Sequence, residues 1–454
     1  MRRVLVANRG EIAVRITRAA HDLGLEAVAV HSAADADALH VRLADDAVEI
    51  GPPPAGKSYL DIDRIVGAAR DSGAEAVHPG YGFLSERADL ARAVEEAGLA
   101  FAGPTADHIA LMGDKAKARE QAAEAGVPTI PGSDGPVADA DEAARVAGEI
   151  GYPVALKAAG GGGGRGIRIV HDAGDLAGSF QTASREASGA FHDARVYVER
   201  FIELARHVEV QVLGDGETAI HLGERECSLQ RRRQKVVEET PAPTIAAETR
   251  QGLCDAAVAL CDAIGYRSAG TVEFLVDDAT GEFFFIEMNT RIRVEHPVTE
   301  LVTGVDLVAE QLRIAAGEGL RLTQDDVAPR GSAIELRINA EDPDNDFMPT
   351  PGTLERIVLP AGPWVRVDTW MEPGAQVPPF YDSLLGKVCL WGEDRPAALA
   401  RARRGLGELT VEGVATTKDL LGRLLDEDWF AAGDFHTSTL ERWLEETATV
   451  SEGA

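Results

Sequence analysis

Residues 160–164 are five consecutive glycines, with Lys157 three positions before them and Arg165 directly after them. Apolar runs on both sides predict one strand before this segment and another after it. Glycine has no Cβ atom, so the backbone amides of such a turn can approach an anion closely, and the two cations add charge. The pattern predicts a loop between two strands that binds a nucleotide phosphate. The alternative is a flexible surface hairpin.

A second glycine-containing stretch, residues 51–58, has the P-loop spacing G-x-x-x-x-G-K-S. A P-loop binds phosphate through backbone N–H groups, and residues 52–54 are prolines, which have none. We therefore interpret this stretch as a turn between a strand ending at Ile50 and a helix that follows Tyr59. The phosphate site is expected at residues 160–164.

Oxygen-bearing side chains occur on two later predicted strands, 271–276 and 282–288. Because side chains alternate along a strand, Glu287 and Asn289 share a face, and Glu273 on the neighbouring strand could converge with them. Two carboxylates and an amide suit Mg²⁺ or Mn²⁺, which prefer oxygen ligands. The alternative is that the two glutamates are ordinary solvent-facing strand residues.

Hydrophobic periodicity indicates the elements that position these groups. Residues 4–30 read as strand, helix and strand, and residues 74–77 read as a strand ending in the loop 78–82. Open α/β sheets bind ligands at such carboxyl ends. We therefore expect the following segments: a parallel α/β domain at 1–113, a linker helix at 114–130, a small α+β lobe carrying the glycine loop at 131–202, a strand-rich core with a carboxy-terminal domain at 203–446, and a disordered tail at 447–454.

Composition narrows the class of protein. The 454 residues carry a formal charge of −30, which argues against nucleic acid as a partner, and no apolar run has the length of a membrane span. The four cysteines form no C-x-x-C pair, so neither a disulfide framework nor a zinc site is indicated, and a cytoplasmic location is expected. Residues 231–235 form a basic run, either a solvated face or a site for anionic substrates.

Several motifs together resemble the biotin carboxylase family in order and spacing. They are residues 8–13 (NRGEIA), 78–86 (HPGYGFLSE), 112–115 (MGDK), the glycine loop, 234–239 (QKVVEE), 287–291 (EMNTR) and 337–342 (RINAED). The match runs from residue 4 to about residue 445. The resemblance implies an ATP-grasp fold, with an amino-terminal parallel α/β domain, a mobile glycine-rich lid at 131–202 and a larger carboxy-terminal domain.

The resemblance also implies a function. Members of this family make carboxyphosphate from ATP and bicarbonate and then carboxylate N1 of biotin on a carrier protein. The implied cofactors are ATP and Mg²⁺ or Mn²⁺ at two sites, with biotin as a carrier-bound substrate. Because the sequence has no Ala-Met-Lys-Met motif, the biotin carboxyl carrier protein and the carboxyltransferase of an acyl-CoA carboxylase are expected to be separate chains. A homodimer is also implied.

The matching positions take their implied roles from the family. The implied ATP-binding residues are Lys115, Lys157, Gly162, Gly163, Gly164, Glu199, Ile202, His207 and Gln230. The implied metal ligands are Glu273, Glu287 and Asn289. Arg291, Lys235 and Val294 would lie around bicarbonate, Glu295 would be the general base, Arg337 would stabilise the biotin enolate and Tyr81 would lie beside the biotin ring.

Two positions depart from the family pattern. Arg293 replaces a glutamine that helps to bind bicarbonate, and Arg233 replaces a histidine near the reacting groups. An inward Arg293 should lower the basicity of Glu295. Convergence of Arg293 and Arg233 beside Arg291 would instead favour a ligase that activates a different carboxylate as an acyl phosphate. A third possibility is an ATP-binding subunit without turnover.

Overall fold

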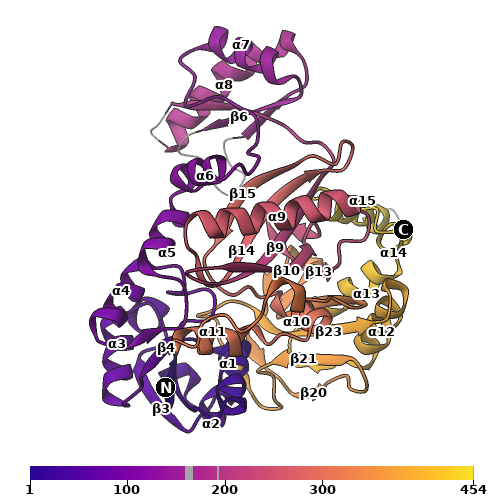
Figure 1. Cartoon of the computed structure of the whole chain (residues 1–454). Helices are drawn as coiled ribbons and strands as arrows, with labels where there is room; N and C mark the ends of the chain where they lie inside the picture. The colour runs from indigo at the N-terminus through magenta and orange to yellow at the C-terminus, as the bar shows by residue number, and fades with distance from the viewer. Residues whose placement is uncertain (159–166, 192–193, 453–454) are drawn as a thin grey trace.

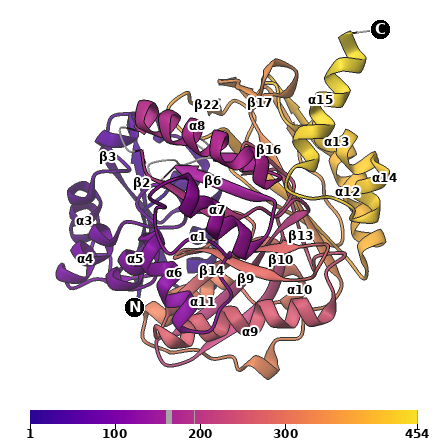
Figure 2. The ribbon, with the colours of Figure 1, turned by 90° about the horizontal axis from the view of Figure 1, so that it is seen from above.

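The computed structural model describes residues 1–158, 167–191 and 194–452. It has three parts: an amino-terminal α/β domain, a large β-rich body and a small lobe that projects from the top of the molecule in Figure 1. Figure 2 looks down on this lobe, which lies over the body between the amino-terminal domain and the carboxy-terminal helices.

The amino-terminal domain is a parallel α/β unit, as the sequence predicts. Its five strands lie in the order β3-β2-β1-β4-β5, and every neighbouring pair is parallel. The elements are β1 (Arg3–Val6), α1 (Gly10–Asp22), β2 (Glu26–Ser32), α2 (Leu39–Leu43), β3 (Asp46–Gly51), α3 (Ile62–Asp71), β4 (Ala76–His78), α4 (Ala88–Glu96), β5 (Ala100–Phe101) and α5 (Ala106–Gly113). Between β3 and α3 the chain makes a turn with one short 3₁₀ segment, which agrees with the rejection of a P-loop there.

The lobe follows a linker helix, α6 (Lys115–Glu124). Its elements are α7 (Ala140–Ile150), β6 (Val154–Ala158), β7 (Ile167–Val170), α8 (Ala173–Phe191) and β8 (Val196–Arg200). The strand β6 pairs antiparallel with both β7 and β8. This pairing confirms the predicted arrangement of strand, loop and strand. The glycine loop itself, including Gly162, Gly163 and Gly164, lies outside the described residues.

The body is built on one eight-stranded antiparallel sheet, with the order β15-β14-β9-β10-β13-β16-β23-β21. Its strands are β9 (Ala205–Asp215), β10 (Ala219–Glu226), β13 (Val237–Thr240), β14 (Arg267–Asp277), β15 (Phe283–Asn289), β16 (Ser332–Asn339), β21 (Val365–Thr369) and β23 (Leu384–Gly392). Smaller paired strands are β11 (Gln230–Arg231) with β12 (Gln234–Lys235), β17 (Glu341–Asp342) with β18 (Met348–Pro349), β19 (Gly352–Thr353) with β22 (Gln376–Val377) and β20 (Arg356–Val358) with β24 (Thr410–Glu412).

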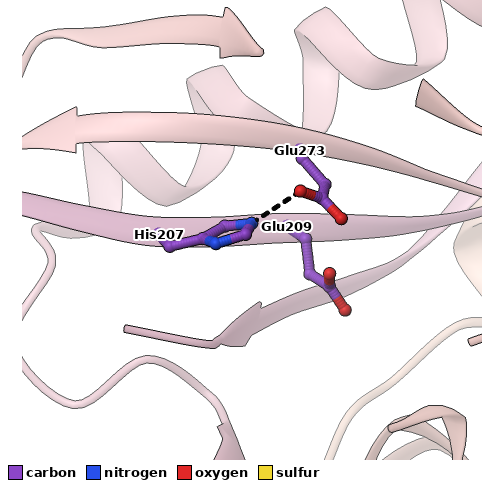
Figure 3. A group of neighbouring side chains, drawn as sticks. All are labelled: His207, Glu209 and Glu273. Atoms are coloured by element: carbon purple, nitrogen blue, oxygen red, sulfur yellow. Dashed lines mark ion pairs between the residues drawn. The ribbon is translucent and has the colours of Figure 1, made fainter. Parts of the chain in front are cut away.

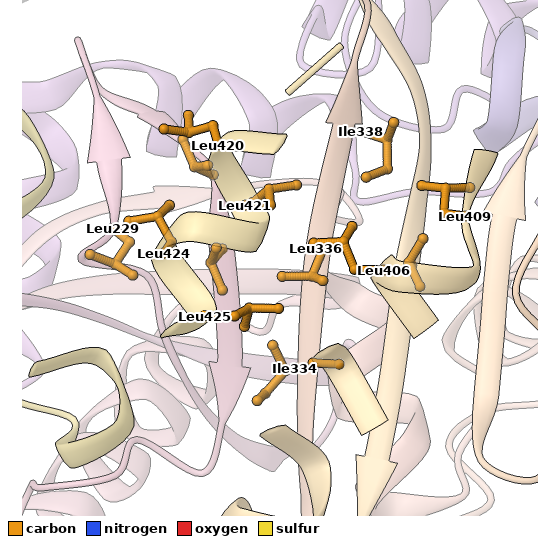
Figure 4. Close-up of a cluster of buried hydrophobic side chains, with 14 of the residues drawn as sticks. Leu229, Ile334, Leu336, Ile338, Leu406, Leu409, Leu420, Leu421, Leu424 and Leu425 are labelled. Atoms are coloured by element: carbon orange, nitrogen blue, oxygen red, sulfur yellow. The ribbon is translucent and has the colours of Figure 1, made fainter. Parts of the chain in front are cut away.

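Helices cover this sheet. They are α9 (Ala247–Ala263), α10 (His296–Thr303), α11 (Leu307–Ala315), α12 (Arg395–Glu408), α13 (Lys418–Asp426), α14 (Asp428–Ala432) and α15 (Thr439–Glu452). In the largest apolar cluster, Ile334, Leu336 and Ile338 of β16 pack against leucines of α12 and α13 (Figure 4). Because side chains alternate along β16, Arg337 points away from these three residues, toward the opposite face.

The carboxy terminus corrects one expectation. The helix α15 continues to Glu452, so most of the segment 447–454, expected to be disordered, is helical. The stretch from Thr439 to Glu452 contains neither proline nor glycine, and nothing in it stops a helix. In the part of the chain that the structure describes, we find no helix long and apolar enough to cross a membrane.

Candidate functional site

The strand β9 separates an apolar face from a polar one. Val208, Val210 and Val212 are fully buried in a core with residues of α9, while His207, Glu209 and Gln211 alternate with them on the other face. Figure 3 shows His207 and Glu209 on β9, with Glu273 on the neighbouring strand. Ligand atoms of these three residues lie within 4.8 Å of one another. The register explains this cluster, because Glu273 pairs directly with Glu209.

A buried lysine joins this cluster to the predicted base. Lys235 Nζ donates to Glu209 Oε2 at 2.6 Å and to Glu295 Oε1 at 2.7 Å. Both carboxylates are fully buried, and Lys235 is 8% exposed. Lys235 comes from the hairpin of β11 and β12, whereas Glu295 directly precedes α10, so tertiary packing brings the two together.

Arg337 contacts the other carboxylate oxygen of Glu295. Its Nη2 atom donates to Glu295 Oε2 at 2.9 Å and also to Glu238, a buried residue on β13. Glu295 is therefore held through both carboxylate oxygens by cations from separate elements. This arrangement places the carboxylate of Glu295, the predicted base, beside fixed positive charge.

Arg293 turns inward. Only 9% of the residue is exposed, and its Nη2 atom lies 2.9 Å from Glu273 Oε1. Its Nε atom donates to Glu295 Oε1 at 3.1 Å. The guanidinium of Arg293 thus bridges Glu273, the predicted metal ligand, and Glu295, the predicted base.

These cations set the acidity of the two carboxylates. Burial alone would raise the pKa of Glu295, but Arg293, Lys235 and Arg337 together hold that pKa well below its ordinary value. The pKa of Glu273 is likewise held well below the ordinary value despite burial, mainly by Arg293 and Lys235. An inward Arg293 thus has the predicted effect on Glu295.

The three predicted metal ligands lie on adjacent strands. Glu273 on β14 pairs with Glu287 on β15, and Asn289 Nδ2 donates to Glu273 Oε1 at 2.9 Å. Glu273 is buried, so the solvent-facing alternative is wrong for this residue. Glu287 is partly open, with Lys115 Nζ 3.7 Å from its Oε2 atom. Carboxylate oxygens of this kind fit Mg²⁺ or Mn²⁺.

Residues predicted to bind ATP line the junction of the lobe and the body. Glu199 on β8 contacts Lys157 of β6, and its Oε1 atom accepts a hydrogen bond from Arg119 of α6 at 3.0 Å. Ile202 is buried beside Ala205 and Phe284. Three more of the predicted ATP residues lie in the described part of the chain: Lys115 at the start of α6, His207 with Nε2 2.8 Å from Glu273 Oε2, and Gln230 paired with Lys235.

The amino-terminal domain contributes Tyr81 to a neighbouring pocket. Its hydroxyl donates to Glu11, and Lys387 lies over its ring, 5.9 Å from the centroid. Lys387 also donates to the backbone oxygen of Val294 at 2.7 Å, which ties the pocket to the segment carrying the base. Tyr81 lines this pocket together with residues 8–12, which include the start of α1.

Arg233 is exposed and does not join the buried Arg293, whereas Arg291 lies beside the predicted metal ligand Asn289. Arg291 donates to Glu86 at 2.9 Å and to Asn289 Oδ1 at 3.0 Å. Arg233 is exposed at the tip of the hairpin of β11 and β12, with a φ of +69°, and no ion pair joins it to another described residue. The anion site expected for a different ligase is therefore not formed by these three arginines.

Sequence reasoning missed three charged residues of this site. Glu209 holds Lys235, Glu238 contacts Arg337, and Arg225 anchors Glu209 by donating to its Oε1 atom at 2.6 Å. All three are fully buried. The polar alternation of residues 207–211 was a signal for Glu209, because that residue shares a strand face with His207.

Comparison with known families covers nearly the whole chain. Residues 1–109 match the family described as biotin carboxylase, N-terminal domain. Residues 114–323 match the ATP-binding domain of the carbamoyl-phosphate synthase L chain, and residues 335–442 match the biotin carboxylase C-terminal domain. Together with the fold, these matches define an ATP-grasp ligase.

Similar proteins narrow this class. A biotin carboxylase of Pseudomonas aeruginosa is 54% identical over 446 residues, which cover 98% of this chain and 99% of that relative. The biotin carboxylase domain of a thermophilic 2-oxoglutarate carboxylase, solved with bicarbonate, is 47% identical with a TM-score of 0.93, and the match covers 97% of this chain and 98% of that one.

A dimer of the corresponding domain from Hydrogenobacter thermophilus, solved with MgADP, ADP and bicarbonate, is 48% identical with a TM-score of 0.86 and covers 97% of each chain. The chain belongs to the biotin carboxylase family. Its activity is ATP-dependent carboxylation of biotin.

Proposed function

We propose that this chain carboxylates carrier-bound biotin through carboxyphosphate, as the biotin carboxylase subunit of an acyl-CoA carboxylase. The observation that carries the proposal is the buried Glu295 carboxylate, held by Lys235 at 2.7 Å and by Arg337 at 2.9 Å. Bicarbonate is an anion that must meet the triphosphate of ATP, and fixed cations offset the repulsion between them.

Each step of the proposed reaction uses particular residues of the chain. Arg291, Lys235 and Val294 hold bicarbonate, and Glu295 removes its proton so that a carboxylate oxygen attacks the terminal phosphorus of ATP. ADP leaves, and carboxyphosphate forms. Its breakdown releases phosphate, which accepts the N1 proton of biotin, and the carbon dioxide unit joins that nitrogen. Arg337 stabilises the enolate charge on biotin, with Tyr81 beside the ring.

The nucleotide and its metal ions require their own ligands. Lys115, Lys157 and Glu199 are proposed to bind ATP with the other predicted residues, and the carboxylates of Glu273 and Glu287 with Asn289 to hold Mg²⁺ or Mn²⁺. The metal supplies charge neutralisation on the phosphates. The solved relative with MgADP supports the choice of magnesium.

Partners follow from the same proposal. A biotin carboxyl carrier protein would present biotin beside Tyr81, and a separate carboxyltransferase would choose the final acceptor. A homodimer is proposed as well, supported by the dimer of the related domain. The cytoplasmic location stays a prediction.

The activity can be tested directly. ATP hydrolysis by the purified chain should depend on bicarbonate, rise with free biotin, and be accompanied by transfer of labelled carbon from bicarbonate to biotin. ATP hydrolysis with another carboxylate, without response to bicarbonate or biotin, would exclude this function in favour of a different ligase.

A further inference from the structure

The cluster of Glu209, Glu273 and Glu295 contains two buried cations. Lys235 Nζ lies 2.6 Å from Glu209 and 2.7 Å from Glu295, but 3.8 Å from Glu273. Arg293 has the opposite preference, since its Nη2 atom lies 2.9 Å from Glu273 and 3.7 Å from Glu209. Glu273 therefore has Arg293 as its nearest full cation in this cluster.

The carboxylate of Glu273 is already well occupied. Its Oε1 atom faces Arg293 and accepts a hydrogen bond from Asn289 Nδ2 at 2.9 Å, and its Oε2 atom lies 2.8 Å from His207 Nε2. A carboxylate offers about four acceptor positions in all. In contrast, among the described residues Glu287 has one ion-pair partner, Lys115, at 3.7 Å. The two proposed metal ligands thus differ in how open they are.

From this contrast we propose that Arg293 is an internal cation that competes with the divalent metal for Glu273. The inference rests on the proposed function, which assigns a metal to Glu273 and Glu287. Because like charges repel strongly in a buried site, a divalent ion on Glu273 must displace Arg293 from its 2.9 Å contact with Oε1. Loss of this contact costs free energy and therefore weakens metal binding.

The competition also links two parts of the site. Arg293 Nε contacts Glu295 Oε1 at 3.1 Å, so the same side chain reaches the proposed base. A guanidinium that leaves Glu273 remains tethered beside Glu295. Arg293 is therefore a positioning residue whose placement depends on metal occupancy, and a neutral glutamine at this position would lack that dependence.

The test is Mn²⁺ affinity, measured from the EPR signal of free Mn²⁺ at a fixed concentration of ADP with a protein-free reference. Arg293→Gln should bind Mn²⁺ about tenfold more tightly than the unchanged protein, since one neighbouring charge is removed. Arg293→Lys keeps the charge and should stay within about threefold. Arg356→Gln removes an exposed arginine paired with Glu412 and is the matched charge control, with no change expected.

The outcomes separate this inference from the proposed function. Weaker Mn²⁺ binding by Glu287→Gln would support the metal site. If Arg293→Gln then binds Mn²⁺ as the unchanged protein does, Arg293 does not compete with the metal. Equal tightening by Arg293→Gln and Arg293→Lys would also overturn the competition, because the charge would then not matter. If neither Glu287→Gln nor Glu273→Gln changes the affinity for Mn²⁺, these residues do not bind the metal, and both the proposed metal site and the competition are wrong.

A second measurement needs no variant, which matters if Arg293→Gln does not fold. A crystal structure of the unchanged protein with Mn²⁺ and ADP should show anomalous density for Mn²⁺ at Glu273, with Arg293 Nη2 moved beyond hydrogen-bond distance of Oε1. A structure with Mn²⁺ on Glu273 and Arg293 still at its present 2.9 Å would overturn the proposal.

Discussion

Arg337 donates a hydrogen bond from Nη2 to Glu295 Oε2 at 2.9 Å, although 42 residues separate the two in the chain. The contact exists because β16 presents alternate side chains to the site, while its other face packs on α12 and α13. Removal of the guanidinium should therefore alter the reacting groups without altering the lobe where ATP is expected to bind.

For Arg337→Ala we expect biotin carboxylation to fall at least about 100-fold, because charge on the biotin enolate loses its stabilising cation. Affinity for ADP should stay within about twofold. Calorimetric ADP binding and transfer of labelled bicarbonate to biotin measure the two quantities. An equal loss of ADP affinity would contradict the assignment. Arg337→Lys serves as the variant that keeps a charge opposite Glu238 and Glu295.

Glu287→Gln should weaken the binding of metal with nucleotide by about tenfold or more and lower ATPase and carboxylation together, since a neutral amide replaces an anionic ligand. Mg²⁺ dependence of the ATPase and EPR titration with Mn²⁺ measure this change. The exposed Glu282, which pairs with Arg200 at 2.9 Å near the start of β15, offers the matched Glu→Gln control. Unchanged metal dependence would exclude Glu287 from the site.

Arg293→Gln should keep or raise bicarbonate-dependent turnover. The pKa of Glu295 is held well below its ordinary value, so loss of Arg293 should raise it and make the carboxylate a stronger base. The acid limb of the pH profile of kcat/KM for bicarbonate should then move to higher pH. If turnover is abolished, or if the acid limb of the pH profile does not move, Arg293 does not lower the activity by reducing the basicity of Glu295.

Stability in mild acid should depend on His40, which is 1% exposed and whose Nε2 atom lies 3.3 Å from the backbone oxygen of Val30. Burial lowers its pKa to about 4. The unfolded chain, with an ordinary histidine pKa near 6.5, binds the proton first, so stability falls as pH drops from about 6.5 to 4. At pH 5 this loss amounts to about 2 kcal/mol.

The variant His40→Gln keeps a donor for Val30 but has no titrating group. Its melting temperature should therefore fall less than that of the unchanged protein between pH 7.5 and pH 5, when both are followed by calorimetry. The many carboxylates are common to both proteins and cancel in this comparison. If the melting temperatures of the two proteins fall equally between pH 7.5 and pH 5, His40 does not cause the loss of stability in acid.

Local patterns were sufficient for much of the fold. The strand and helix periodicities at residues 4–30 predicted the parallel domain, and alternation placed Glu273 and Glu287 on strands that do pair. The end of the chain was predicted less well. Residues 447–452 continue α15, because weak hydrophobicity alone does not stop a helix that lacks glycine and proline.

The sequence by itself determined the family, the types of candidate catalytic side chain and the strand faces on which several of them lie. Only the tertiary structure decided which charges meet. Lys235 comes from a hairpin, Glu209 from β9 and Glu295 from the start of α10, so no local period relates them. The inward turn of Arg293 was also undecided in the sequence, because it depends on the buried carboxylates of Glu273 on β14 and of Glu295, which offset the cost of burying a cation.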